Sequence, residues 1–193
     1  MDILNRASLV FRLPIGIQEA LNDTQIQIRR KAGADLVRWT PVNELALTLV
    51  TLGEISPLQI AQIGTAVNSI APQFVPIDIV LAGLGGSPTN LQPRFLWIGL
   101  GGDVEALTQL NAHLERTVSP FLPGHEVRPF PAYLPIGRLK QESESNRSAL
   151  GRAIRVAAIG EIGRFHAGSL ELVRMAGTSA GPTMITVQSY PLG

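Results

Sequence analysis

Short segments in which apolar and polar residues alternate recur along the chain, and longer segments with apolar residues at helical spacing separate them. Alternation is typical of a strand with one buried face, and spacing of three and four residues is typical of a helix with one buried stripe. The sequence therefore predicts strands at 9–13, 37–39, 45–52, 75–81, 95–100, 127–139, 170–175 and 184–190. The predicted helical stripes are Ile17, Ala20, Leu21 and Ile28; Ile60, Ile63, Val67 and Ile70; and Val104, Leu107, Leu110, Leu114 and Val118.

Cap and turn residues mark where several of these elements begin and end. Ser56 and Pro57 suit the N-cap and first turn of the second helix, and Asp103 suits the cap of the third. The glycines at 83–86 predict a turn. A short helix is predicted at 149–159 after a polar loop, and the last two strands are expected to form a closing hairpin.

Prolines interrupt the strand predicted at 127–139. Pro129, Pro131 and Pro135 have no N–H to donate to a neighbouring strand. We therefore expect this strand to lie at the edge of a sheet or to contain a bulge.

The order of the elements, roughly βαβαββαβαββ, favours an α+β fold in which outer helices cover the sheets. A chain of 193 residues is long enough for one sizeable domain, or for two small lobes with a shared core, and too short for two ordinary domains. We therefore predict a single domain over residues 1–193.

Composition and charge narrow the classes of function. Hydrophobic residues make up 45% of the chain and charged residues 16%, as is typical of a folded globular protein. A formal net charge of +1 argues against nonspecific DNA binding by the whole molecule, so any anion site is local. The absence of cysteine excludes disulfides, thiolate zinc sites and cysteine catalysis. Without a signal pattern or an apolar run near the roughly 20 residues of a membrane span, we expect a cytoplasmic protein with no membrane partner.

Two segments resemble the 2H phosphoesterase (2′-5′ RNA ligase-like) family. Residues 37–54 read VRWTPVNELALTLVTLGE and are similar to the family pattern V-R-W-x-P-x-x-N-L-H-L-T-L-x-F-L-G-E. Residues 126–138 read EVRPFPAYLPIGR and are similar to R-P-F-x-P-H-L-T-L-x-R. Residues 83–85, 93–99 and 190–192 are similar to further family segments, so the resemblance covers almost the whole chain.

The resemblance implies two pseudo-symmetric, intertwined lobes, each an antiparallel sheet with outer helices, around a central cleft. Each lobe of such a protein contributes one H-x-T motif. The two histidines act as general base and general acid, and the two threonines hold the phosphate. The implied activity is that of an RNA 2′,3′-cyclic phosphodiesterase, a hydrolase that needs no metal or other cofactor.

Three residues depart from this pattern. Side chains at i and i+2 of a strand point to the same side, so both residues of each motif reach the cleft. Ala46 stands at the first histidine position, Tyr133 at the second and Pro135 at the second threonine position, and only Thr48 matches. Alanine has no titratable group, and a phenol is poorly matched to proton transfer at neutral pH. Since each acid or base contributes about 10²- to 10⁴-fold in rate, we expect no useful turnover by the family mechanism.

Three histidines lie elsewhere, and none is followed by x-Thr. His113 falls in the third predicted helix and His166 at the start of a late strand, so we interpret them as helix-surface and strand-edge residues. His125 lies eight residues before Tyr133, and an extended segment of that length carries it roughly 25 Å away unless the chain doubles back. We interpret His125 as a solvated loop histidine.

Four residues are candidate ligand contacts. Thr48 can donate a hydrogen bond to a phosphate, although a β-branched residue is also ordinary in a strand. Tyr133 can stack on a base or bond a phosphate, although filling the cleft by packing is the favoured interpretation. Arg128 and Arg138 flank the second motif and can clamp a phosphate through guanidinium hydrogen bonds.

The arginines near both motifs differ in how strand geometry places them. Simple alternation puts Arg138 on the Leu134 side, so it reaches the cleft only if the strand is bulged or ends early. Arg38 and Arg94 match family positions, and we interpret them as residues of strand ends and inter-strand ion pairs.

The leading hypothesis is a 2H-fold protein without catalytic residues, whose cleft binds an RNA end, a nucleotide or another small anion. One alternative is a weak or repurposed RNA 2′,3′-cyclic phosphodiesterase with new residues in the same cleft. A second is a structural or protein-interaction module, for which the sequence identifies no partner.

Overall fold

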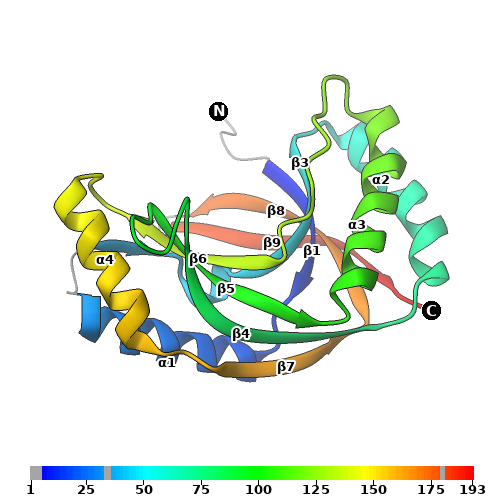
Figure 1. Cartoon of the computed structure of the whole chain (residues 1–193). Coiled ribbons are helices and arrows are strands. Elements are labelled where there is room, and N and C mark those ends of the chain that lie inside the picture. The colour runs from blue at the N-terminus through cyan, green and yellow to red at the C-terminus, as the bar shows by residue number, and fades with distance from the viewer. Residues whose placement is uncertain (1–5, 33–35, 179–180) are drawn as a thin grey trace.

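The computed structural model describes residues 6–32, 36–178 and 181–193. Its strands form two antiparallel sheets with helices on their outer sides (Figure 1). The predicted α+β class, with antiparallel sheets and outer helices, is confirmed. Within the described residues, no helix combines the length and the apolar character that a membrane crossing requires.

The four-stranded sheet has the order β3-β1-β8-β9. Helices α2 and α3 pack against it, and their predicted stripes supply Ile63, Val67, Leu107 and Leu110 to a shared buried cluster. The bounds of these elements are β1 Arg6–Arg12, β3 Ala46–Glu54, α2 Pro57–Ile70, α3 Val104–Val118, β8 Ser169–Thr178 and β9 Gly181–Pro191.

The five-stranded sheet has the order β2-β6-β5-β4-β7. Helices α1 and α4 cover one of its faces (Figure 1), and this second cluster contains Ile17, Leu21 and Ile28 of the first predicted stripe. The bounds are α1 Ile15–Ala32, β2 Val37–Trp39, β4 Ile77–Ser87, β5 Phe95–Gly102, β6 Tyr133–Leu139, α4 Glu144–Ala157 and β7 Glu161–Ala167. Short 3-10 turns occupy Val42–Glu44, Ala71–Gln73 and Ser119–Phe121.

The chain crosses between the two sheets several times. Strand β2 belongs to the five-stranded sheet, although its neighbours in sequence, β1 and β3, pair with each other in the four-stranded sheet. Strands that follow one another in the sequence therefore belong to different sheets at these points.

Cap residues place the helix starts as predicted, with one difference in mechanism. Ser56 and Gln59 form a reciprocal capping box at the start of α2, with Pro57 as the first helical residue. Asp103 occupies the N-cap of α3 without a side-chain cap bond, and its carboxylate accepts the N–H of Asp78 at 3.3 Å. Helix α4 begins before the predicted residue 149, because Ser143 caps it through the N–H of Asn146.

Two element predictions are corrected, and a third is confirmed with a different length. The glycines at 83–86 do not form a turn, because β4 continues through Ser87 with a bulge at Gly83, whose φ is +74°. His166 lies near the end of strand β7, a strand absent from the predicted ranges, and not at the start of a late strand as predicted. The hairpin of β8 and β9 is confirmed and is longer than expected; the tip of its predicted turn lies outside the described residues.

Strand β6 is shorter than the proline-rich strand that the sequence predicts. It begins at Tyr133, so Pro129 and Pro131 precede it. It is an interior strand of the sheet, but β2 pairs only with Gly137–Leu139, so the first half of β6 has a strand neighbour on one side. The predicted bulge is confirmed opposite Leu96 and Trp97.

Candidate ligand-binding cavity

Both sheets contribute a strand to a cavity of about 850 Å³. Strand β3 supplies Ala46 and Thr48, strand β6 supplies Tyr133 and Pro135, and the segment before β6 supplies Arg128. Five residues singled out from the sequence therefore line one cavity. We refer to it as the motif cavity.

On the β3 side, alternation delivers Ala46 and Thr48 to the cavity as predicted. Leu47 and Leu49 are buried in the core, whereas Thr48 is exposed. A register shift between Leu9 and Val10 of β1 then puts Val50 into the core as well, so simple alternation ends there.

An arginine lies next to Ala46 but is already occupied. Arg12 pairs with Ala46 across β1 and β3. Its guanidinium donates to Glu171 at 3.1 Å, to the carbonyl of Met184 at 3.1 Å and to the hydroxyl of Thr186 at 3.0 Å. These bonds hold Arg12 within the four-stranded sheet, so it is not a free anion contact.

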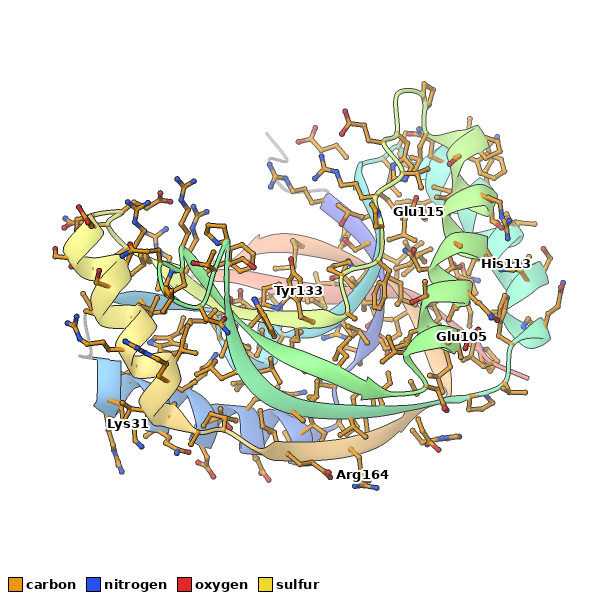
Figure 2. All side chains as sticks on the ribbon, in the orientation of Figure 1. Lys31, Glu105, His113, Glu115, Tyr133 and Arg164 are labelled. Atoms are coloured by element: carbon orange, nitrogen blue, oxygen red, sulfur yellow. The ribbon has the colours of Figure 1, made fainter. Side chains whose placement is uncertain are left out.

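On the β6 side, Tyr133 belongs to an aromatic cluster. Its ring stacks on that of Trp97, with centroids 5.4 Å apart and an interplanar angle of 29°. Phe95 lies 6.1 Å away between centroids. Figure 2 shows Tyr133 on the side of the sheet away from α1 and α4. Tyr133 therefore packs against Trp97 and also lines the motif cavity, which it does not fill.

The position of the Trp97 indole ring requires a glycine at residue 85. A Cβ at Gly85 would come within 2.2 Å of the indole ring. We predict that Gly85→Ala displaces Trp97 and its partner Tyr133, and lowers the free energy of unfolding by about 1–3 kcal/mol, since overpacking has this typical cost. Urea unfolding and the intrinsic tryptophan fluorescence measure both effects.

The matched control is Gly101→Ala in β5. Its added Cβ would lie 3.6 Å from Val80, an ordinary contact. If the Gly85→Ala variant has the same fluorescence and stability as the Gly101→Ala variant, residue 85 does not need to be glycine to accommodate Trp97.

His125 does not lie where the sequence interpretation put it. Its side chain is only 11% exposed, and its Nε2 contacts Oε2 of Glu115 at 2.5 Å. Glu115 is itself 7% exposed, and both residues line the motif cavity. The interpretation as a solvated loop histidine is therefore wrong.

The chain doubles back between these two residues. Helix α3 ends in the 3-10 turn Ser119–Phe121, and Gly124 follows with a φ of +77°. The N–H of His125 then bonds the carbonyl of Leu122 at 3.0 Å. Figure 2 shows Glu115 on the side of α3 that faces this returning segment. Pro120, Pro123 and Gly124 were the available signal for a chain reversal.

The four arginines near the motifs differ in their partners. Arg128 lines the cavity and forms a highly exposed ion pair with Glu126 at 3.1 Å. Arg94, which lies just before β5, forms an ion pair at 3.2 Å with Glu142 in the segment between β6 and α4, so the pair is not between two strands as expected. The bulge in β6 turns Arg138 to the Tyr133 face, opposite Phe95, but Arg138 is not among the cavity-lining residues. Arg38 faces Arg138 across β2 and β6, and within the described residues it makes no ion pair of the kind expected from the sequence.

The remaining titratable candidates lie outside the cavity. His113 is exposed on α3, as predicted. His166 lies on the edge strand β7 and contacts Asp78 at 2.8 Å. Tyr190 is buried in the core of the four-stranded sheet, and desolvation raises its pKa to about 12. Within the described residues, no group of three histidine, aspartate or glutamate side chains is arranged to hold a metal ion.

Known proteins similar to this chain in sequence and in fold come from the same family. No protein-family model matches the chain. The RNA 2′,3′-cyclic phosphodiesterase of Aeropyrum pernix is 30% identical over 141 residues, which cover 73% of this chain and 78% of that protein. The RNA 2′,3′-cyclic phosphodiesterase of Aquifex aeolicus is 25% identical over 178 residues, which cover 91% of this chain and 93% of that protein.

Solved structures share the fold over nearly the whole length. E. coli LigT complexed with 3′-AMP superposes with a TM-score of 0.74 at 18% identity, covering 98% of both chains. TT0787 of Thermus thermophilus superposes with a TM-score of 0.73 at 19% identity, covering 96% of this chain and 97% of that one.

The two antiparallel sheets with outer helices define a two-lobed α+β protein of the LigT type. The identity to the A. pernix protein over more than two thirds of both chains identifies the family within this class. The chain belongs to the RNA 2′,3′-cyclic phosphodiesterase family of the 2H phosphoesterases.

Proposed function

We propose that this protein keeps the 2H scaffold, lacks the acid–base pair of the family mechanism, and binds a nucleotide, an RNA end or a small anion in the motif cavity. The observation that carries the proposal is that Ala46, Tyr133 and Pro135 line the same cavity as Thr48. At the two proposed histidine positions there is a methyl group and a phenol, and neither is suited to reversible proton transfer at neutral pH.

The same side chains retain features suited to binding. The exposed hydroxyl of Thr48 can donate to a phosphate oxygen, and the guanidinium of Arg128 can add a charged hydrogen bond. The Tyr133 ring, already stacked on Trp97, can accept a base on its free side. The fold relatives E. coli LigT and Kluyveromyces marxianus Usb1 were crystallised with nucleotides, among them 3′-AMP, ATP and uridine monophosphate.

Calorimetric titration with 3′-AMP tests the binding proposal. We expect saturable binding, weakened about tenfold by Thr48→Val, because this change removes one hydrogen bond to a charged group and nearly preserves shape. Thr108→Val on the exposed face of α3 is the matched control and should leave the affinity unchanged. The absence of binding at millimolar 3′-AMP contradicts the proposal.

A second candidate function rests on the His125–Glu115 pair. A carboxylate that holds one imidazole nitrogen is the usual way to orient a histidine base. In a repurposed phosphodiesterase, His125 would take a proton from the water that attacks the phosphorus. One P–O bond to the ribose would then break, and solvent would protonate the leaving oxygen. Hydrolysis of 2′,3′-cyclic AMP that is lost in His125→Gln, while 3′-AMP binding persists, favours this candidate over the first.

A further inference from the structure

One face of the five-stranded sheet carries three aromatic rings and two arginines. They are Phe95 and Trp97 of β5, Tyr133 and Arg138 of β6, and Arg38 of β2. We call this set the aromatic–arginine face. Register places Arg138 opposite Phe95 and Arg38 opposite Arg138. Their neighbours Val37, Leu96 and Leu139 are buried in the cluster under α1 and α4, so the aromatic–arginine face points the other way.

Arg38 and Arg138 form a like-charge pair for which the described residues supply no counter-charge. Both are exposed, and among the described residues neither makes an ion pair or a hydrogen bond through its side chain. Arg12, Arg94, Arg128 and Arg164 differ, since each contacts a glutamate. Like charges directly opposite on neighbouring strands destabilise a sheet. A bound polyanion would remove that cost, because each guanidinium could then contact a phosphate.

The rings beside this pair are held in place. Trp97 lies over Gly85, and its Nε1 donates to the hydroxyl of Ser87 at 3.2 Å. Tyr133 stacks on Trp97, and Phe95 lies beside Tyr133. All three residues are half-buried, and since Trp97 already packs on Gly85 and Tyr133, Tyr133 and Phe95 are the rings left to accept bases. Aromatic rings on a sheet with adjacent arginines suit the stacked bases and charged backbone of a single strand better than an acidic peptide, which offers no bases to stack.

The face starts at the motif cavity and leads away from it. Tyr133 belongs to both, and Phe95, Arg138 and Arg38 follow across β5, β6 and β2. We propose that the aromatic–arginine face binds the nucleotides that adjoin an RNA terminus held in the motif cavity, with bases on the rings and phosphates on Arg138 and Arg38. This proposal rests on the proposed function of the cavity, and it names a strand of several nucleotides as the ligand.

The test compares 3′-AMP with an adenosine hexanucleotide that ends in a 3′-phosphate. The hexanucleotide should bind at least about tenfold more tightly, because its extra bases and phosphates gain contacts on the face. Arg38→Gln should weaken hexanucleotide binding several-fold and reduce the slope of log affinity against log salt by about 0.7, the value for one phosphate contact on a single strand. The affinity for 3′-AMP should not change. Arg155→Gln, exposed on α4 over the opposite face, is the matched control.

Charge reversal adds a readout that does not depend on RNA. Arg38→Glu replaces the like-charge pair with an opposite-charge pair, so the melting temperature should rise by about 1–4 °C while hexanucleotide affinity falls further than in Arg38→Gln.

The possible outcomes distinguish failure of the aromatic–arginine face proposal from failure of the motif cavity proposal. Equal affinities for 3′-AMP and the hexanucleotide overturn the face and leave the cavity proposal intact. Hexanucleotide binding that depends on Arg38, without 3′-AMP binding, supports the face and overturns the cavity. Binding of neither overturns both. A polyglutamate peptide that competes as well as RNA overturns the assignment to a nucleic-acid strand.

Discussion

A variant that carries Ala46→His, Tyr133→His and Pro135→Thr should hydrolyse a 2′,3′-cyclic mononucleotide at least about 10²-fold faster than the natural chain. That factor is the lower bound for a single general acid or base, and the variant gains two imidazoles. The structural reason is that all three positions line the motif cavity with Thr48, on strands from opposite sheets. Initial rates on 2′,3′-cyclic AMP at neutral pH measure the change.

The single variants are the controls for this experiment. Ala46→His alone and Tyr133→His alone should stay far below the triple variant, because an acid and a base that act as a unit have strongly non-additive effects. If the triple variant is folded and binds 3′-AMP but stays inactive, the cavity has been reshaped, and the missing histidines are not the main reason for the loss of chemistry.

The variant Glu115→Ala should lower the free energy of unfolding by about 3 kcal/mol. Breaking a buried pair leaves its partner desolvated without compensation, and both side chains are nearly buried here. His125 also anchors the segment that leads into β6, so the loss should loosen that wall of the cavity. Urea unfolding followed by circular dichroism gives the magnitude.

The exposed pair of Glu126 and Arg128 supplies a matched control. These side chains are 78% and 81% exposed, so Glu126→Ala should cost less than about 1 kcal/mol. Combined Glu115→Met and His125→Leu should recover most of the stability, because an apolar pair of similar volume replaces a buried polar one. Equal unfolding midpoints for Glu115→Ala and Glu126→Ala would show that the Glu115–His125 pair does not stabilise the fold.

The spacing of apolar residues predicted most helices and strands, because which side of a helix or strand is buried is visible in its own sequence. The stripes of the first three helices are largely buried, and β2 has the predicted bounds. Ala46 and Thr48 reach the cavity for the same reason, since a strand sends i and i+2 to one side.

The errors arose where backbone irregularity or distant packing decides the outcome. The glycines at 83–86 look like a turn in sequence, but Gly85 is needed beneath Trp97, which lies on a different strand. Arg138 changes face through a bulge whose position alternation does not give. His125 reaches Glu115 only because the chain reverses after α3, a tertiary event that local spacing does not encode.

Phosphorus NMR of 2′,3′-cyclic AMP with an excess of the natural protein tests the central claim most directly, because one spectrum reports binding and chemistry together. The claim predicts that the cyclic phosphate resonance shifts or broadens on addition of protein and that no phosphomonoester resonance grows with time. A growing monoester signal that disappears in the His125→Gln variant would contradict it.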